Sequence, residues 1–212
     1  MDNALIQQAV TALTRGAVIA YPTETIYGLG VDPFQPKALQ RLLDLKERRS
    51  DKGLILLVSG KAMASELIKE MTPSAERLME SFWPGPLTLV LPARHHLSKI
   101  ITGQPWQGQR WVAIRHSPSE TVSTLMKLWN KPLVSTSANR SKEPVARSAK
   151  QIESLWGSQL GCIIPGEVNR QNQPSTVVRL QDDQMTILRT GVIPDEKITA
   201  CLRATEEIKY SD

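Results

Sequence analysis

The stretch AVIAYPTETIYGLG, residues 17–30, passes from an apolar run into a polar loop. Residues 17–21 are all apolar, which is typical of a short buried β-strand, and Pro22 ends the run because proline cannot donate a hydrogen bond to a sheet. Two threonines, a glutamate and two glycines follow. Ligands of open α/β sheets bind at the carboxyl ends of the strands, so this loop is a candidate binding segment. An ordinary turn that uses the conformational freedom of glycine is the alternative interpretation.

Helix-like and strand-like patterns alternate along the rest of the chain. Apolar residues at helical spacing predict helices over residues 3–15, 36–48, 62–70, 74–82, 120–129, 149–156 and 195–203. Short apolar or β-branched runs predict further strands over residues 54–59, 86–91, 111–115, 132–135, 162–164, 175–180 and 185–189. The last two runs flank a pair of aspartates, as the strands of a hairpin do, so a mixed sheet is predicted. The fold class is therefore α/β or α+β.

Length, charge and cysteine content narrow the class of protein. A chain of 212 residues with 41% hydrophobic content suits one core, so we expect a single domain over residues 1–212. Lys and Arg number 26 against 21 for Asp and Glu, an excess that favours anionic partners such as nucleotides, pyrophosphate or RNA. Cys162 and Cys201 lie far apart, and the first 16 residues contain Asp2 but no continuous apolar run. These features indicate neither a disulfide framework nor a signal peptide and favour a cytoplasmic protein.

The standard phosphate-binding signatures are missing from the sequence. Gly28 and Gly30 are followed by Val-Asp-Pro where a dinucleotide fingerprint needs its third glycine, and Gly60-Lys61-Ala62 lacks the hydroxyl residue of a P-loop. Phosphates would therefore be held mainly by side-chain cations and loop amides.

The segment LKERRSDKG, residues 45–53, brings four cations to one helix end and the loop after it. Lys46 with Arg48 or Arg49 is a candidate polyphosphate site, because a guanidinium fork and a lysine point charge bind phosphate in complementary ways. A solvated basic helix end is the alternative, since the helix dipole favours cations there.

The segment PLVSTSAN, residues 132–139, runs from an apolar strand into three hydroxyl residues and an amide. Small side chains at such a place let a ligand approach the backbone, whereas a capped turn is the alternative interpretation. The three histidines, His95, His96 and His116, show neither a hydrolase triad pattern nor metal-ligand spacing, so no protein-bound metal is expected.

Seven segments in order resemble the YrdC-like threonylcarbamoyl-AMP synthase family in its short form, over about residues 6–191. They are YPTETIYGLG (21–30), LKERRSDKGLIL (45–56), FWPGPLTLVL (82–91), VAIRHSP (112–118), PLVSTSAN (132–139), PSTVV (174–178) and ILRTG (187–191). The resemblance implies a twisted mixed sheet with helices around a large basic cavity.

The resemblance also implies an activity. Such enzymes form threonylcarbamoyl-AMP and pyrophosphate from ATP, L-threonine and bicarbonate, with Mg²⁺ carried by ATP, as nucleotidyltransferases that serve tRNA modification. A tRNA threonylcarbamoyl-transferase complex is then the downstream acceptor, and tRNA binding is expected. A non-catalytic tRNA- or rRNA-binding module and a paralogue acting on another carbamoyl substrate are the alternatives.

The family pattern assigns roles to individual positions. It implies that Thr25 and Ser175 bind threonine, and that Lys46 and Arg49 are catalytic. The residues expected to bind ATP are Lys46, Arg49, Thr88, Arg115, Ser137, Asn139 and Arg189. One departure is that Ser141 is followed by Lys142, where members commonly have a Ser-Gly pair.

Overall fold

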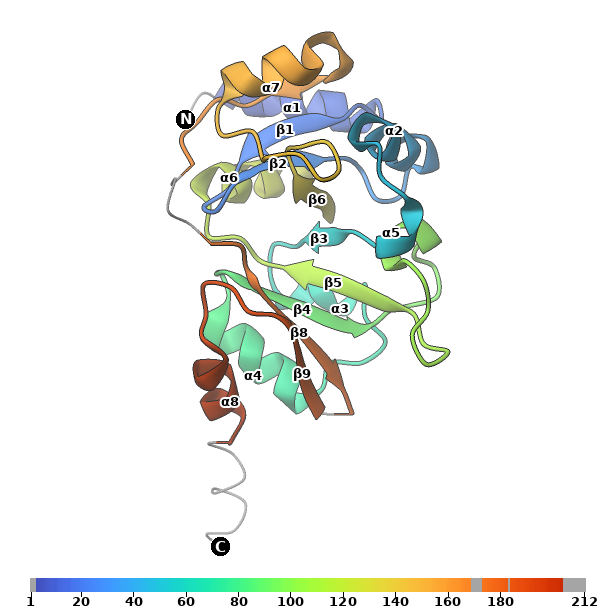
Figure 1. The fold of residues 1–212 in the computed structure, drawn as a ribbon, viewed down its shortest axis with the longest axis vertical. Coiled ribbons are helices and arrows are strands. Elements are labelled where there is room, and N and C mark those ends of the chain that lie inside the picture. Colours follow the sequence, from blue (N-terminus) through green and yellow to red (C-terminus); the bar gives the residue numbers. More distant parts are fainter. Residues whose placement is uncertain (1–2, 169–172, 183, 204–212) are drawn as a thin grey trace, which may run out of the picture.

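The computed structural model describes residues 3–168, 173–182 and 184–203. A nine-stranded sheet in the order β7-β1-β2-β6-β3-β5-β4-β8-β9 runs along the molecule, with helices packed on it at both ends (Figure 1). The strands are β1 (Ile19–Pro22), β2 (Tyr27–Gly30), β3 (Ile55–Leu57), β4 (Leu87–Pro92), β5 (Trp111–Arg115), β6 (Leu133–Ser137), β7 (Cys162–Ile163), β8 (Thr176–Gln181) and β9 (Gln184–Arg189). The α-helices are α1 (Asn3–Thr14), α2 (Pro36–Lys46), α3 (Lys61–Ser65), α4 (Pro73–Phe82), α5 (Lys99–Thr102), α6 (Glu120–Trp129), α7 (Ala149–Trp156) and α8 (Asp195–Arg203). Two 3-10 turns, η1 (Ser50–Lys52) and η2 (Gly157–Gln159), complete the elements.

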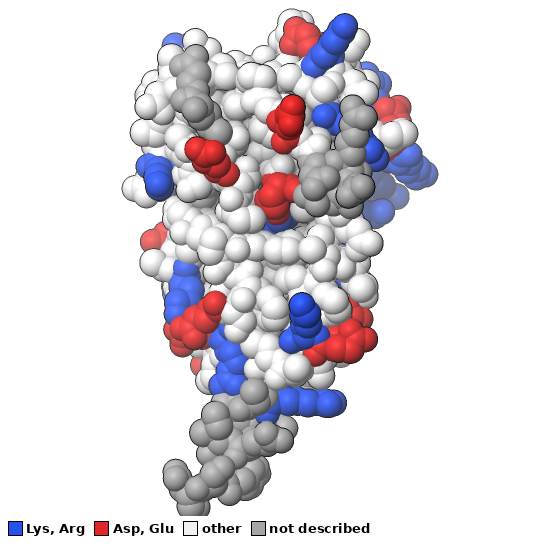
Figure 2. Space-filling view, turned by 90° about the vertical axis from the view of Figure 1, so that its left-hand side faces the viewer, with Lys and Arg blue, Asp and Glu red and all other residues white. Residues whose placement is uncertain are grey.

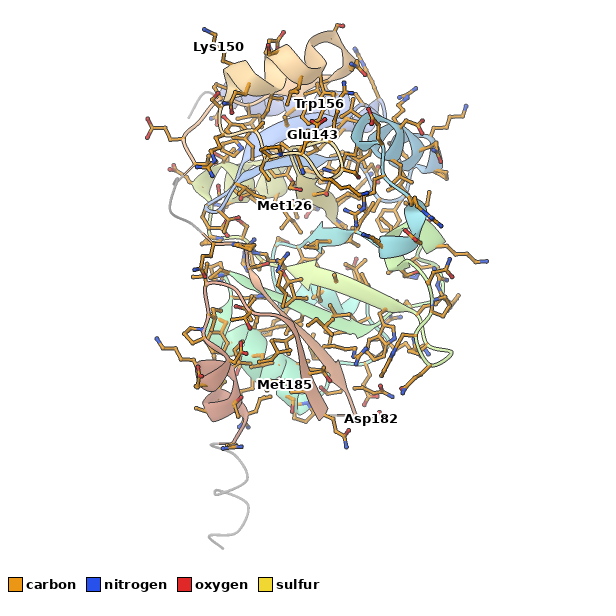
Figure 3. The ribbon with its side chains drawn as sticks, in the orientation of Figure 1. Met126, Glu143, Lys150, Trp156, Asp182 and Met185 are labelled. Carbon is orange, nitrogen blue, oxygen red and sulfur yellow. The ribbon has the colours of Figure 1, made fainter. Side chains whose placement is uncertain are left out.

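The sheet is mixed, as predicted. Strand pairs β1–β7, β3–β5 and β4–β8 are parallel, and the other neighbours are antiparallel. The predicted hairpin is β8–β9, and its turn residue Asp182, labelled in Figure 3, has a φ of 48°. Aspartate tolerates this left-handed conformation better than most residues, which explains why it occurs at the turn.

Helix ends follow local chemistry. The side chain of Thr72 accepts a hydrogen bond from the N–H of Ala75 at the start of α4, and Ser119 does the same for α6. Pro36 occupies the first turn of α2, and Glu47 ends that helix in the left-handed region with a φ of 51°. The cap at Glu47 turns the chain sharply, and this turn decides where the next basic residues lie.

Two groups of buried side chains hold the layers together. One contains Ile6, Leu13, Tyr21, Leu125 and Trp129, where α1 and α6 pack on the β1 end of the sheet. The other extends through the remaining strands and their helices, with α4 and α8 beside each other at the opposite end (Figure 1). Burial of this apolar surface is the main stabilising contribution.

Two expectations about local structure were wrong. Residues 27–30, expected to be loop, form β2 because Gly30 lets the ring of Tyr21 and the Val134 carbonyl approach. A Cβ at Gly30 would lie 2.8 Å from each of them. The helix expected over 62–70 stops at Ser65, since Ile68 leaves it to form a β-bridge with Ala93. Residues 166–174 are polar and contain glycine and proline, a composition that predicts a loop, and part of this stretch lies outside the described residues.

Candidate functional site

A cavity of about 470 Å³ opens on the sheet where β6, β3 and β5 lie between the β1–β2 turn and β8–β9. Its walls combine aliphatic side chains with hydroxyl groups and cations. The polar lining residues include Thr25, Arg48, Arg115, Ser137, Ser175 and Arg189. These residues come from six separate segments of the chain, so the fold itself builds the site.

The β1–β2 turn supplies two threonines to one wall. The Thr23 hydroxyl accepts hydrogen bonds from the N–H groups of Thr25 at 3.2 Å and Ile26 at 3.1 Å, which closes the turn. The hydroxyls of Thr23 and Thr25 lie 3.0 Å apart. Both residues are buried against the protein while facing the cavity, so their hydroxyls are held in place before any ligand enters.

The end of α2 meets the end of β6 at a buried lysine. The Lys46 ammonium donates to the main-chain oxygens of Ser137 and Asn139, at 2.7 Å for Asn139, and to Asn139 Oδ1 at 3.2 Å. The Ser137 hydroxyl also donates to Asn139 Oδ1, at 2.5 Å. Burial, and then the nearby charge of Arg48, lower the pKa of Lys46 to about 8. Lys46 therefore sits behind Ser137 and holds it, while Ser137 itself lines the cavity.

Arg48 and Arg49 diverge after the Glu47 cap. Arg48 lines the cavity and donates to the Gly53 carbonyl at 2.7 Å, and burial lowers the pKa of its guanidinium. The Arg49 side chain is 88% exposed and lies 3.6 Å from Asp51. The structure thus places Arg48 at the cavity, and Arg49, for which a catalytic role was expected, outside its lining.

The loop before β8 and the end of β9 supply the opposite wall. The hydroxyls of Thr88 and Ser175 lie 2.8 Å apart, and the Arg189 guanidinium donates to the Ser175 carbonyl at 2.8 Å and to its hydroxyl at 3.1 Å. Thr88 is fully buried, so it supports Ser175 from behind. Ser175 and Arg189 line the cavity.

Arg115 ends β5, on which alternate residues Trp111, Ala113 and Arg115 face the cavity. Its Nε donates to the Gly85 carbonyl at 3.1 Å, and its guanidinium pairs with Glu24. Burial, followed by the charge of Arg189, lowers the pKa of Arg115 to about 10, while Tyr21 acts in the opposite direction. Arg115 therefore stays cationic at neutral pH.

The predicted site residues fall into three groups. Thr25, Arg115, Ser137, Ser175 and Arg189 line the cavity. Lys46, Thr88 and Asn139 stand directly behind lining residues through the hydrogen bonds above. Arg49 lies apart from both groups. Lys52 and Thr23 also line the cavity and were not predicted, although both lie in segments that the sequence singled out.

The departure at Lys142 has a local structural consequence. Lys142 has a φ of 71°, in the left-handed region that favours glycine. The chain keeps this turn despite the side chain, and the N–H of the preceding Ser141 donates to the Lys46 carbonyl at 2.9 Å. The Trp156 indole, labelled in Figure 3, donates to the neighbouring Leu45 carbonyl at 3.3 Å. The end of α2 is therefore held from two sides.

Charges of both signs are mixed on one face of the molecule. Figure 2 shows a face on which Lys and Arg are interspersed with Asp and Glu instead of forming one basic patch. Within the described part of the chain, no three His, Cys, Asp or Glu side chains cluster as metal ligands would. The described helices include none with the length and apolar character needed to cross a membrane.

Comparison with known proteins identifies relatives over most of the chain. Residues 11–191 match the Sua5/YciO/YrdC family model, described as telomere recombination. A threonylcarbamoyl-AMP synthase of Vibrio vulnificus is 39% identical over 188 residues, which cover 88% of this chain and 98% of that protein. The structure of P. abyssi Sua5 complexed with L-threonine superposes with a TM-score of 0.85 at 35% identity, covering 92% of this chain and 56% of that one. E. coli YciO, at 24% identity, shares the fold with a TM-score of 0.79 over 91% of this chain and 92% of its own.

Proposed function

Because the chain belongs to the Sua5/YciO/YrdC family, we propose that it is a threonylcarbamoyl-AMP synthase. It joins L-threonine, bicarbonate and ATP to give L-threonylcarbamoyladenylate and pyrophosphate, as a nucleotidyltransferase. The observation that carries the proposal is the convergence of Arg48, Arg115 and Arg189 with the hydroxyls of Thr25 and Ser175 on one cavity of about 470 Å³. Preorganised cations beside small hydroxyls suit an enzyme that must hold two anions together.

We place threonine at the end formed by the β1–β2 turn, Ser175 and Arg115. Hydroxyls of Thr25 and Ser175 match the polar groups of an amino acid, and a guanidinium fork matches its carboxylate. The P. abyssi Sua5 structure holding L-threonine supports a threonine site in this fold. Arg189 contacts this end of the cavity through its hydrogen bond to the Ser175 carbonyl.

We place the ATP phosphates near Arg48, Lys52 and Ser137. Arg48 and Lys52 are cations on the cavity wall, and Ser137 offers its hydroxyl at the end of β6. Lys46 and Asn139 hold Ser137 from behind. Mg²⁺ enters as part of the substrate, bound to ATP.

The chemistry then needs no protein nucleophile. The neutral amine of threonine attacks bicarbonate, giving a carbamate anion and water. A carbamate oxygen attacks the α-phosphorus of ATP, and the bond to the β-phosphate oxygen breaks to release pyrophosphate. The protein contributes by positioning the two anions and by stabilising charge on the phosphates. We further propose that residues 1–212 act as one domain and that the adenylate passes to a tRNA-modifying complex.

Mass spectrometry of the nucleotide products after incubation with ATP, L-threonine and labelled bicarbonate tests the proposal. The expected product is an adenylate that carries the labelled carboxyl group, together with pyrophosphate. Steep salt-dependent RNA binding without ATP turnover would instead favour the RNA-binding module. Replacing threonine by other amino acids in a pyrophosphate-release assay tests for a paralogue with a different substrate.

A further inference from the structure

Glu24 connects two walls of the cavity that lie apart in the sheet. It belongs to the turn between β1 and β2, and its carboxylate pairs with the guanidinium of Arg115 at the end of β5. Strands β6 and β3 separate β2 from β5 in the sheet order. The other carboxylate oxygen of Glu24 accepts a hydrogen bond from the Ser117 hydroxyl at 2.6 Å. One carboxylate is therefore held by two groups from the segment that carries Arg115.

The pair is largely withdrawn from water. The Arg115 side chain is 9% exposed and that of Glu24 is 22% exposed. An ion pair in such surroundings is screened less than one at the surface, and losing one partner is costly because a buried charge is left unpaired. Arg115 also donates through Nε to the Gly85 carbonyl. Contacts on two sides of the guanidinium restrict its rotation before any substrate is bound.

The turn has other contacts that maintain its shape. The N–H of Thr23 donates to the Ile26 carbonyl at 3.0 Å, and the Thr23 hydroxyl accepts from the N–H groups of Thr25 and Ile26. The Ser119 hydroxyl donates to the Pro22 carbonyl at 3.3 Å. Loss of the Glu24 charge should therefore leave the turn in place while freeing Arg115.

We propose that Glu24 is a positioning residue, which fixes the Arg115 guanidinium in the orientation that binds the carboxylate of the amino-acid substrate. This inference rests on the proposed function for the identity of that substrate. Glu24 acts through Arg115 and does not touch the reacting atoms. Its loss should weaken threonine binding selectively, because Arg48 and Lys52 at the phosphate end do not depend on it.

Four variants test the inference. Glu24→Gln keeps the shape and removes the charge, whereas Glu24→Asp keeps the charge on a shorter side chain. Ser117→Ala removes the hydrogen bond that orients Glu24, and Glu153→Gln removes an exposed carboxylate on α7 as a matched control. Threonine KM, ATP KM and kcat are measured for each variant. Threonine binding is also followed by calorimetry without ATP, and folding by thermal unfolding.

For Glu24→Gln we expect threonine KM and Kd to rise about tenfold, while ATP KM and kcat change by less than about threefold. Glu24→Asp should recover part of this loss, Ser117→Ala should show a smaller effect in the same direction, and Glu153→Gln should match the wild type. Unchanged threonine binding in Glu24→Gln would overturn the inference. So would an equal loss of ATP and threonine binding with a lowered Tm, since that indicates a purely structural role.

The two proposals fail in distinguishable ways. If the wild type binds threonine and forms no adenylate, the proposed reaction is wrong, and calorimetry on the Glu24 variants still decides the inference. If the wild type forms the adenylate and Glu24→Gln binds threonine normally, only the inference is wrong. A wild type that binds no threonine overturns both.

Discussion

The ammonium of Lys46 lies 2.7 Å from the main-chain oxygen of Asn139, which holds the end of α2 against the turn that follows β6. Lys46 is 3% exposed and also donates to the Ser137 carbonyl, whereas Ser137 faces the cavity. This lysine therefore shapes the Ser137 side of the cavity from behind. Its substitution should affect both folding and chemistry.

Lys46→Ala should lower the rate of adenylate formation by about 100- to 1000-fold, by analogy with the loss of a preorganised donor at an oxyanion. It should also lower the free energy of unfolding by about 1–3 kcal/mol, because buried oxygens lose their donor. Labelled-bicarbonate incorporation and urea unfolding measure the two effects. Lys150→Ala, an exposed change on α7, is the control. Wild-type rates in Lys46→Ala would remove this residue from the mechanism.

The lowered pKa of Lys46 predicts a specific dependence of stability on pH. In the folded protein the pKa is about 8, against 10.5 for the unperturbed group, so between these values the unfolded chain binds more protons. Stability must then rise with pH in this window, by on the order of 1.4 kcal/mol per pH unit, and be flat below it. The measurement is urea unfolding of the wild type minus that of Lys46→Met from pH 6 to about 10.5. If this difference in the free energy of unfolding instead falls with rising pH in this window, the three oxygen acceptors stabilise the charged ammonium more than burial destabilises it.

Arg48 and Arg49 provide a paired test of the cavity. Arg48→Ala should weaken ATP binding by about tenfold or more, since a charge-assisted contact at the cavity wall is lost. Arg49→Ala should stay within about twofold of the wild type, because an exposed ion pair contributes little. Both substitutions remove one positive charge from the same segment, so net charge cannot explain a difference. ATP titration by calorimetry checks both values, and the reverse order of effects would contradict the placement of the phosphates.

The sequence predicted regular elements better than it predicted the positions of individual side chains. Helices 120–129, 149–156 and 195–203 have the predicted bounds because an amphipathic period is a local signal, as are the serine caps that precede the first two. Strand β2 was missed because its glycines give the sequence no periodic pattern. Glycine is needed there because the ring of Tyr21 packs closely against it across the β1–β2 hairpin. Arg48 and Arg49 are adjacent and chemically identical. Only the left-handed Glu47 cap and the contact with Gly53 decide which of them faces the cavity.

The hydroxyl pair Thr88 and Ser175 should behave as one unit in threonine binding. Ser175→Ala removes a hydroxyl that lines the cavity and should raise threonine KM by about tenfold. Thr88→Val removes the buried hydroxyl that lies 2.8 Å from that of Ser175, and it should raise threonine KM by a smaller factor. The double variant should be less affected than the product of the two single changes, because both act through one hydrogen bond. Independent, multiplicative effects in this double-mutant cycle would show that Thr88 acts elsewhere.

Lys142 offers a test in which stability should increase. Its φ of 71° costs a residue with a side chain about 1 kcal/mol relative to glycine, partly offset by the greater freedom of glycine in the unfolded chain. Lys142→Gly should therefore raise the free energy of unfolding by up to about 1 kcal/mol. Lys127→Gly, the same change in the helical backbone of α6, should lower it by about 1 kcal/mol. Because the Ser141 N–H already holds the turn to α2, adenylate formation by Lys142→Gly should match the wild type. A loss of stability in Lys142→Gly would mean that the lysine side chain makes a stabilising contribution that outweighs its backbone strain.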